Sequence, residues 1–201
     1  MALLLNNLDH RVLINDKSSR KDFMTMFSDY DLKERLLTYR NIDIYFGDCR
    51  NEHYDFILDY TGDLNCPEQT GSYRYIIVNS SMNRQEILDH LKQAVSLKKE
   101  TILVLRDTTG GGKDRTYLKQ NYMKFMTFVS CLYEIPLDYT DKDYQTEMDY
   151  GGFIQFRYLS QKYCKTLIKI AGILTGKPEH MAEKALKYAK EGKIFDNRVL
   201  E

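Results

Sequence analysis

Short apolar runs alternate along the chain with longer segments of helical periodicity. The runs that predict strands are residues 11–15, 42–46, 54–59, 73–79, 101–106 and 131–136. The segments that predict helices are the opening stretch MALLLNNL, a polar segment from the first strand through about Leu37, and residues 83–98, 116–128, 156–174 and 179–191. This alternation predicts an α/β fold with a mostly parallel sheet. Because the strands are apolar on both faces, we expect helices to flank both faces of that sheet.

The start of the chain departs from the usual order of such folds. The opening helix runs straight into a strand, whereas doubly wound folds begin with a strand, and the turn between that strand and the first helix binds phosphate. No linker or internal repeat interrupts the pattern. We therefore predict one α/β domain over residues 1–176. A C-terminal helical tail over 177–201 follows the break at Gly176-Lys177-Pro178.

Composition and charge limit the cellular compartment and the binding partners that we expect for this protein. Lys and Arg total 29 and so do Asp and Glu, so no net field attracts nucleic acid or an anionic membrane. The apolar stripe of the last helix is mostly alanine, and we do not expect it to contact a membrane. The four cysteines are far apart and form no C-x-x-C pair. This pattern favours reduced thiols in a cytoplasmic protein.

The stretch YDFILDYTGD ends an apolar run in one acid, Asp59, and places a second, Asp63, beyond Gly62. In a nucleotide-binding fold, an acid at such a strand end lies on the magnesium side of a phosphate site. The phosphate side is missing, because no G-x-x-x-x-G-K-[ST] occurs in the chain. In the nearest match, DTTGGGKDR (107–115), Asp107 and Asp114 take positions that the motif gives to a glycine and a Ser or Thr. We expect a surface turn there.

Three basic residues form a second candidate group. Arg106, Lys113 and Arg115 are expected near one loop at the carboxyl edge of the sheet, where such folds bind ligands. They are candidates for contact with an anion or an acidic partner, and a solvated loop is the alternative. The histidines lack metal-ligand spacing, so no metal site is predicted.

Several segments together resemble the ParA/MinD family of deviant P-loop ATPases, which belong to the SIMIBI class. The similar segments, in the family's order, are ALLLNNLDHRVLIND (2–16), YDFILD (54–59), YIIVNSSMNRQEILDHLKQAV (75–95), EIPLDYTDKDYQTEMDYGGFI (134–154) and LSQKYCKTLIKIAGILTG (159–176). The resemblance implies a P-loop NTPase-like fold that is entered just past the phosphate loop, with the first strand missing.

The same resemblance gives roles to individual residues. Asp59 matches the acid that holds magnesium through water, and a polar residue that merely ends a buried strand is the alternative. Asp16 matches the acid that closes the second strand of the family. Asp63 is assigned to the same remnant of a nucleotide and magnesium site, with a turn beside Gly62 as its alternative. Ser18 stands where the family has the acid that positions the attacking water. No catalytic residue is therefore predicted.

The leading hypothesis is a catalytically deficient ParA/MinD-like protein, a pseudo-ATPase. It would act as an interaction or regulatory module in a bacterial positioning, partition or assembly system, with a full-length ATPase paralogue or a second copy of itself as partner. The alternative is an N-terminally incomplete ATPase that binds ATP and magnesium as a sandwich dimer, if a phosphate loop precedes Met1. A second alternative is an unrelated α/β binding domain. As the chain stands, no cofactor is assigned.

Overall fold

The structure is a computed structural model that describes residues 1–20, 22–27, 35–49, 52–62, 73–81, 83–109 and 112–192. It confirms an α/β protein with helices flanking its sheets. The chain divides into two compact units, one made of Met1–Asp63 with Thr140–Glu201 and the other of Leu64–Tyr139. In place of the single sheet that the sequence predicts, the described strands form two sheets.

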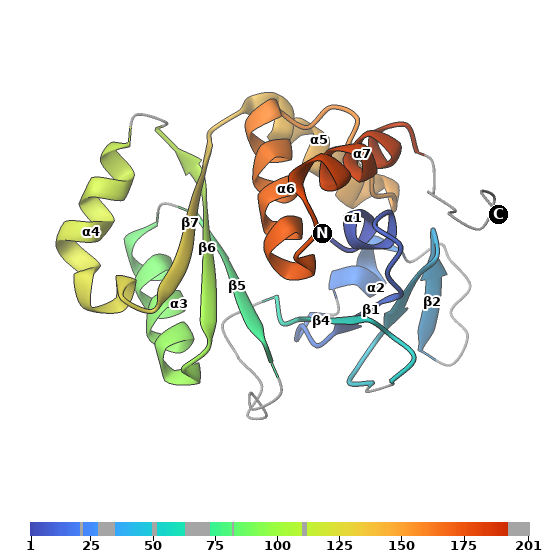
Figure 1. The fold of residues 1–201 in the computed structure, drawn as a ribbon, viewed down its shortest axis with the longest axis horizontal. Helices are drawn as coiled ribbons and strands as arrows, with labels where there is room; N and C mark the ends of the chain where they lie inside the picture. The colour runs from blue at the N-terminus through green and yellow to red at the C-terminus, as the bar shows by residue number, and fades with distance from the viewer. Residues whose placement is uncertain are drawn as a thin grey trace. The chain divides into compact units, whose positions relative to one another are not determined.

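The first unit contains a mixed four-stranded sheet of order β2-β3-β1-β4 (Figure 1). Its elements are α1 (Ala2–Asn6), β1 (Val12–Asp16), α2 (Asp22–Met26), β2 (Leu36–Tyr39), β3 (Ile42–Tyr45), β4 (Phe56–Tyr60), α5 (Tyr139–Gly151), α6 (Gln161–Thr175) and α7 (Glu179–Lys190). β1 lies between β3 and β4 and runs parallel to both. β4 is at the edge, with β1 as its one neighbour among the described strands.

The prediction of a helix through about Leu37 is wrong at its end. Residues 36–39 form β2, which pairs antiparallel with β3. The two strands are joined by a tight turn in which Arg40 and Asn41 both have positive φ, at 50° and 60°. A two-residue turn in which both central residues have positive φ has the backbone twist that a β-hairpin requires. Side chains along β2 alternate between exposed and buried, as expected for a strand with one face on the core.

The core of the first unit is built on its N-terminal helix and strand. Leu4 and Leu5 of α1 are fully buried, and all five residues of β1 are buried as well. α7 packs on α1 and α6. The Asn7 side-chain amide donates to the carbonyl of Ala185 in α7 at 3.3 Å. The segment predicted as a separate tail thus includes a helix that forms part of this core.

The second unit is a parallel three-stranded sheet of order β5-β6-β7. Its elements are β5 (Tyr75–Ser80), α3 (Arg84–Leu97), β6 (Glu100–Thr108), α4 (Lys113–Met126) and β7 (Val129–Pro136). Figure 1 shows α3 and α4 side by side on one face of this sheet. Their buried side chains, among them Leu91 and Leu118, form one apolar cluster with Leu103 and Leu105 of β6. The strands and helices predicted for this segment are confirmed, with shifted ends.

Two further boundaries differ from the prediction. α5 was not expected, and the helix predicted to begin at residue 156 begins at Gln161. There the Ser160 hydroxyl accepts a hydrogen bond from the backbone of Tyr163, which caps the helix. Among the described residues, no helix combines the length and the apolar character needed to cross a membrane.

Candidate functional site

The carboxyl ends of β1 and β4 bring together the acids that the sequence singles out. The two strands are parallel and in register, with Asn15 beside Asp59 and Asp16 beside Tyr60. Side chains alternate between the faces of a sheet. Asn15 and Asp59 therefore share one face, and Asp16 and Tyr60 share the other. Asp16 and Asp59, assigned to one magnesium remnant, belong to two different clusters.

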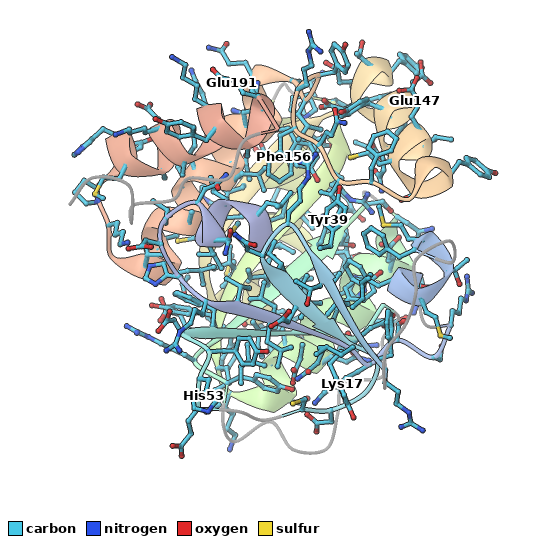
Figure 2. The ribbon with its side chains drawn as sticks, turned by 90° about the vertical axis from the view of Figure 1, so that its right-hand side faces the viewer. Lys17, Tyr39, His53, Glu147, Phe156 and Glu191 are labelled. Carbon is cyan, nitrogen blue, oxygen red and sulfur yellow. The ribbon has the colours of Figure 1, made fainter. Side chains whose placement is uncertain are left out.

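The first cluster is centred on Asp59, whose side chain is only 3% exposed. One carboxylate oxygen accepts from the Asn15 amide at 2.8 Å. The other lies 2.9 Å from the ammonium of Lys17, and that ammonium is also 2.9 Å from Asp48. The Asn15 side chain is held in turn by the backbone of Cys49. Its amide nitrogen donates to the Cys49 carbonyl at 3.0 Å, and its amide oxygen accepts from the Cys49 N–H at 3.2 Å. Lys17, labelled in Figure 2, thus joins the ends of β1 and β4 to the segment after β3.

The second cluster is centred on Asp16, which is fully buried. One carboxylate oxygen accepts from the backbone and the hydroxyl of Ser18, at 3.0 and 2.5 Å, and the other accepts from the backbone of Phe23 at 3.0 Å. The Ser18 hydroxyl accepts in turn from the backbone of Asp22 at 2.9 Å. These contacts satisfy amide groups at the start of α2 that the helix itself leaves without partners. Asp16 and Ser18 together form the cap of α2.

The end of β4 and the residue Gly62 beyond it contact this second cluster. The Tyr60 hydroxyl donates to Asp22 at 2.9 Å. Gly62 has a φ of 70°, and a Cβ at this position would lie 2.8 Å from the Cβ of Ser18 and 2.9 Å from an Asp22 carboxylate oxygen. A glycine here allows the close approach. Asp63, the third acid of the predicted remnant, lies outside the described residues.

Magnesium, which the resemblance implies at Asp59, does not fit the side chains present. The ion needs carboxylate oxygens that are open to it. The oxygens of Asp59 are held by Lys17 and Asn15, and those of Asp16 by the cap of α2. In the described part of the chain, no three His, Cys, Asp or Glu side chains come together as a metal site. We therefore derive no chemical step through a metal ion here.

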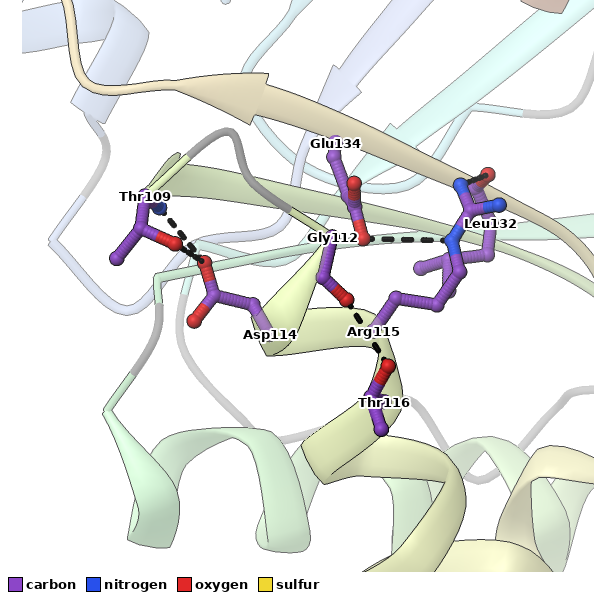
Figure 3. A network of polar contacts seen from close by, with 7 residues as sticks. All are labelled: Thr109, Gly112, Asp114, Arg115, Thr116, Leu132 and Glu134. Atoms are coloured by element: carbon purple, nitrogen blue, oxygen red, sulfur yellow. Dashed lines mark hydrogen bonds and ion pairs between the residues drawn. The ribbon is translucent and has the colours of Figure 1, made fainter.

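The predicted basic group belongs to the second unit and does not stand on one loop. Arg106 lies within β6, and its Nε is buried with no hydrogen-bond partner among the described residues. Lys113 and Arg115 lie in the first turn of α4. Figure 3 shows that Arg115 is turned toward β7, where it pairs with Glu134 at 3.3 Å and donates to the carbonyl of Leu132 at 3.5 Å. Lys113 is exposed.

The start of α4 holds an acid of its own. Asp114 accepts from the backbone of Thr109 at 2.6 Å and from its hydroxyl at 3.0 Å (Figure 3). A negative charge at this end of a helix is favourable. The Asp114 carboxylate thereby supplies the negative charge that a bound phosphate would bring to this end of α4. Contact of Lys113 with an acidic partner stays a prediction.

Sequence reasoning missed Lys17, Asn15 and Asp48. One signal was available for Lys17, which directly follows β1, at the edge where the parallel neighbour β4 ends in Asp59. A lysine and an acid that close adjacent parallel strands are expected to meet. Asp48 follows β3 after a turn, and no periodic pattern places it.

Comparison with known proteins gives no family for this chain. No protein-family model matches it, and no curated protein matches it.

Proposed function

We propose that this chain is a catalytically deficient ParA/MinD-like protein that works as an interaction or regulatory module. In this proposal its fold is that of a P-loop NTPase without the phosphate-binding strand. It serves a bacterial positioning, partition or assembly system and binds a full-length ATPase paralogue or a second copy of itself.

The observation that carries the proposal is the internal neutralisation of Asp59. An acid that serves magnesium in an ATPase must face the ion and its water shell. Here the acid is almost fully buried, and its charge is compensated by Lys17. The second observation is the bond between Ser18 and Asp16, which uses the position of the water-positioning acid to cap a helix. Both observations support a protein that kept the fold of such an ATPase but lost the side chains that ATP hydrolysis requires.

A specific feature favours the incomplete ATPase as second candidate. β4 is apolar and half-buried at the edge of its sheet, with β1 alone beside it among the described strands. Parallel strands are normally covered and paired on both sides. In a right-handed crossover, a strand that precedes α1 would lie in the same sheet as β1 and parallel to it. Such a strand, carrying a phosphate loop, would pair with the open edge of β4.

Two measurements separate the candidates. The first is the intact mass of the protein from its native cells: a mass above the 23.7 kDa of this chain, with additional N-terminal residues, would favour the ATPase. The second measurement is size-exclusion chromatography of the chain with an ATPase paralogue from the same cells, without nucleotide. The proposal predicts co-elution. A complex that forms only when ATP and magnesium are added would contradict it.

A further inference from the structure

The outer face of α5 carries two carboxylates and a tyrosine in one stripe. Asp143, Glu147 and Tyr150 are spaced by four and three residues, which places their side chains on one side of the helix. All three are exposed, Tyr150 to 91%. Among the described residues, neither carboxylate has a hydrogen-bond or ion-pair partner. Like charges at this spacing oppose helix formation, and an exposed aromatic side chain beside them is typical of a protein interface.

α6 presents a stripe of the opposite charge. Lys162, Lys165 and Lys169 are exposed and are spaced by three and four residues. The buried side chains of this helix are all uncharged, so the ammonium groups gather on its solvent side. In the part of the chain that the structure describes, none of the three has a hydrogen-bond or ion-pair partner. The stripe therefore suits an external surface of negative charge.

The two stripes match in charge and in spacing when the helices run antiparallel. An α-helix rises 1.5 Å per residue, so each stripe has members at about 0, 6 and 10.5 Å along its axis. This holds when α5 is followed from its start and α6 from its end. The pairs that then lie opposite each other are Asp143 with Lys169, Glu147 with Lys165, and Tyr150 with Lys162. The first two pairs are salt bridges, and the third is a cation–π contact.

The stripes lie on different sides of the first unit. Figure 2 shows α5, with Glu147, on one side of it, and α6 and α7, with Glu191, on the other. The acidic stripe of one copy can therefore meet the basic stripe of a second copy, while the remaining stripe of each copy stays open. Such a contact is heterologous, and it allows further copies to add.

We propose that this chain associates with further copies of itself head to tail, through α5 of one copy and α6 of the next. Exposed salt bridges are weak and are screened by salt, so the association is weak and salt-sensitive. This inference deepens the proposed function, and it rests on that function in taking the chain to act by binding a protein partner.

The experiment is sedimentation velocity of the whole chain over a range of concentrations, at about 0.05 M and about 1 M salt. The sedimentation coefficient of the wild type is expected to rise with protein concentration at low salt and to return to the monomer value at high salt. Asp143→Lys/Glu147→Lys and Lys165→Glu/Lys169→Glu are each expected to stay monomeric. An equimolar mixture of the two variants is expected to associate, because each reversed stripe then meets its opposite.

Two further samples test the position and the direction of the contact. Lys119→Glu/Lys124→Glu alters exposed lysines of α4 and changes the net charge as the α6 variant does. It is expected to associate like the wild type. The α5 variant, added to the wild type, is expected to shorten the assemblies, because it keeps one intact stripe and ends each chain that it joins.

Three outcomes overturn the inference. The first is a wild type that stays monomeric at low salt, and the second is self-association that survives in the α5 or the α6 variant. The third is an association that stops at the dimer. All substituted residues are exposed, and circular dichroism checks that the variants fold. If a charge reversal prevents folding, the neutral Asp143→Asn/Glu147→Gln replaces it and is expected to lose association in the same way.

The inference and the proposed function fail separately. A monomeric wild type that still forms a nucleotide-independent complex with a paralogue would contradict the head-to-tail contact alone. Magnesium-dependent ATP binding by the wild type would contradict the proposed function. The charge-reversal mixture would still decide the contact between α5 and α6, because that contact involves no nucleotide.

Discussion

Gly62, two residues after β4, lies close to the cap of α2. Its positive φ alone makes alanine unfavourable, by about 1 kcal/mol or more. The Cβ would also meet Ser18 and Asp22 at less than 3 Å. We predict that Gly62→Ala lowers the free energy of unfolding by at least about 2 kcal/mol, as measured by urea denaturation.

Gly112 provides the matched control for this prediction. Its φ is 72°, nearly that of Gly62, but a Cβ there would have no atom within 4 Å. Gly112→Ala should therefore lower the free energy of unfolding only by the backbone contribution, about 1 kcal/mol. Equal losses for the two variants would show that the close approach at Gly62 contributes nothing to stability.

Buried basic groups make stability depend on pH. Burial lowers the pKa of the Met1 amine from 8.0 to about 6. Burial, and then the charge of Lys177, lowers the pKa of His10 below its usual 6.5, against opposing effects of Asp55 and Asp9. Burial lowers the pKa of His90 as well. For each group the unfolded chain binds more protons than the folded chain between the two pKa values.

The free energy of unfolding is therefore expected to rise with pH up to about 8: the two histidines contribute below pH 6.5 and the Met1 amine between about 6 and 8. Urea denaturation at a series of pH values measures the slope. A variant with His10→Gln and extra residues ahead of Met1, which moves the amine away from α1, should have a flatter profile. A stability that decreases with rising pH in this window would contradict the assignment of these groups.

At the scale of single residues, the sequence indicated the right acids but not their use. Asp16 and Asp59 do lie at strand ends, as predicted, and the structure adds that the two strands are adjacent. Their roles depend on which face each side chain occupies and on the neighbours Ser18 and Lys17. Strand register decides the face and the neighbours of each acid, and register is set by pairing between distant segments.

Among the elements, α7 is the one whose packing is easiest to test. Ala182, Ala185 and Ala189 are buried, and the carbonyl of Ala185 accepts from Asn7. We predict that Ala185→Leu lowers the free energy of unfolding by about 1–3 kcal/mol, because extra side-chain volume must displace α1 or α6. Glu183→Leu, at an exposed position of the same helix, should change it by less than about 0.5 kcal/mol. Equal effects in thermal or urea unfolding would mean that α7 does not pack on the domain.

The elements that sequence reasoning missed lack a local signal. The turn of the β2–β3 hairpin has Arg40 and Asn41 in place of the Asn-Gly or Asp-Gly pair that marks such turns. Within α5, the buried residues are Asp141 and Tyr144, so the helix shows no apolar stripe. By contrast, the strands of the parallel sheets were predicted because they are nearly continuous apolar runs.

For the whole molecule, the alternation of strands and helices along the sequence predicted the α/β class. It did not predict that the chain divides into two units. Each unit has a sheet of its own, and β4 and β5 each lie at the edge of one. An apolar run predicts a strand, but it does not indicate which strand lies beside it. The ParA/MinD resemblance supplied an order of strands. The resemblance stays a prediction for the fold as well as for the function, because the structure shows the α/β class alone and function rests on individual residues.

The central proposal is that this chain is a catalytically deficient ParA/MinD-like protein in which Asp59 no longer serves magnesium-bound nucleotide. Isothermal titration of the whole chain with ATP and magnesium, up to millimolar concentration, tests it most directly. The account predicts no saturable binding and no ATP-dependent change in oligomeric state. Saturable binding that requires magnesium and is lost in Asp59→Asn would contradict it, and would favour the second candidate, in which Asp59 serves the metal of a bound nucleotide.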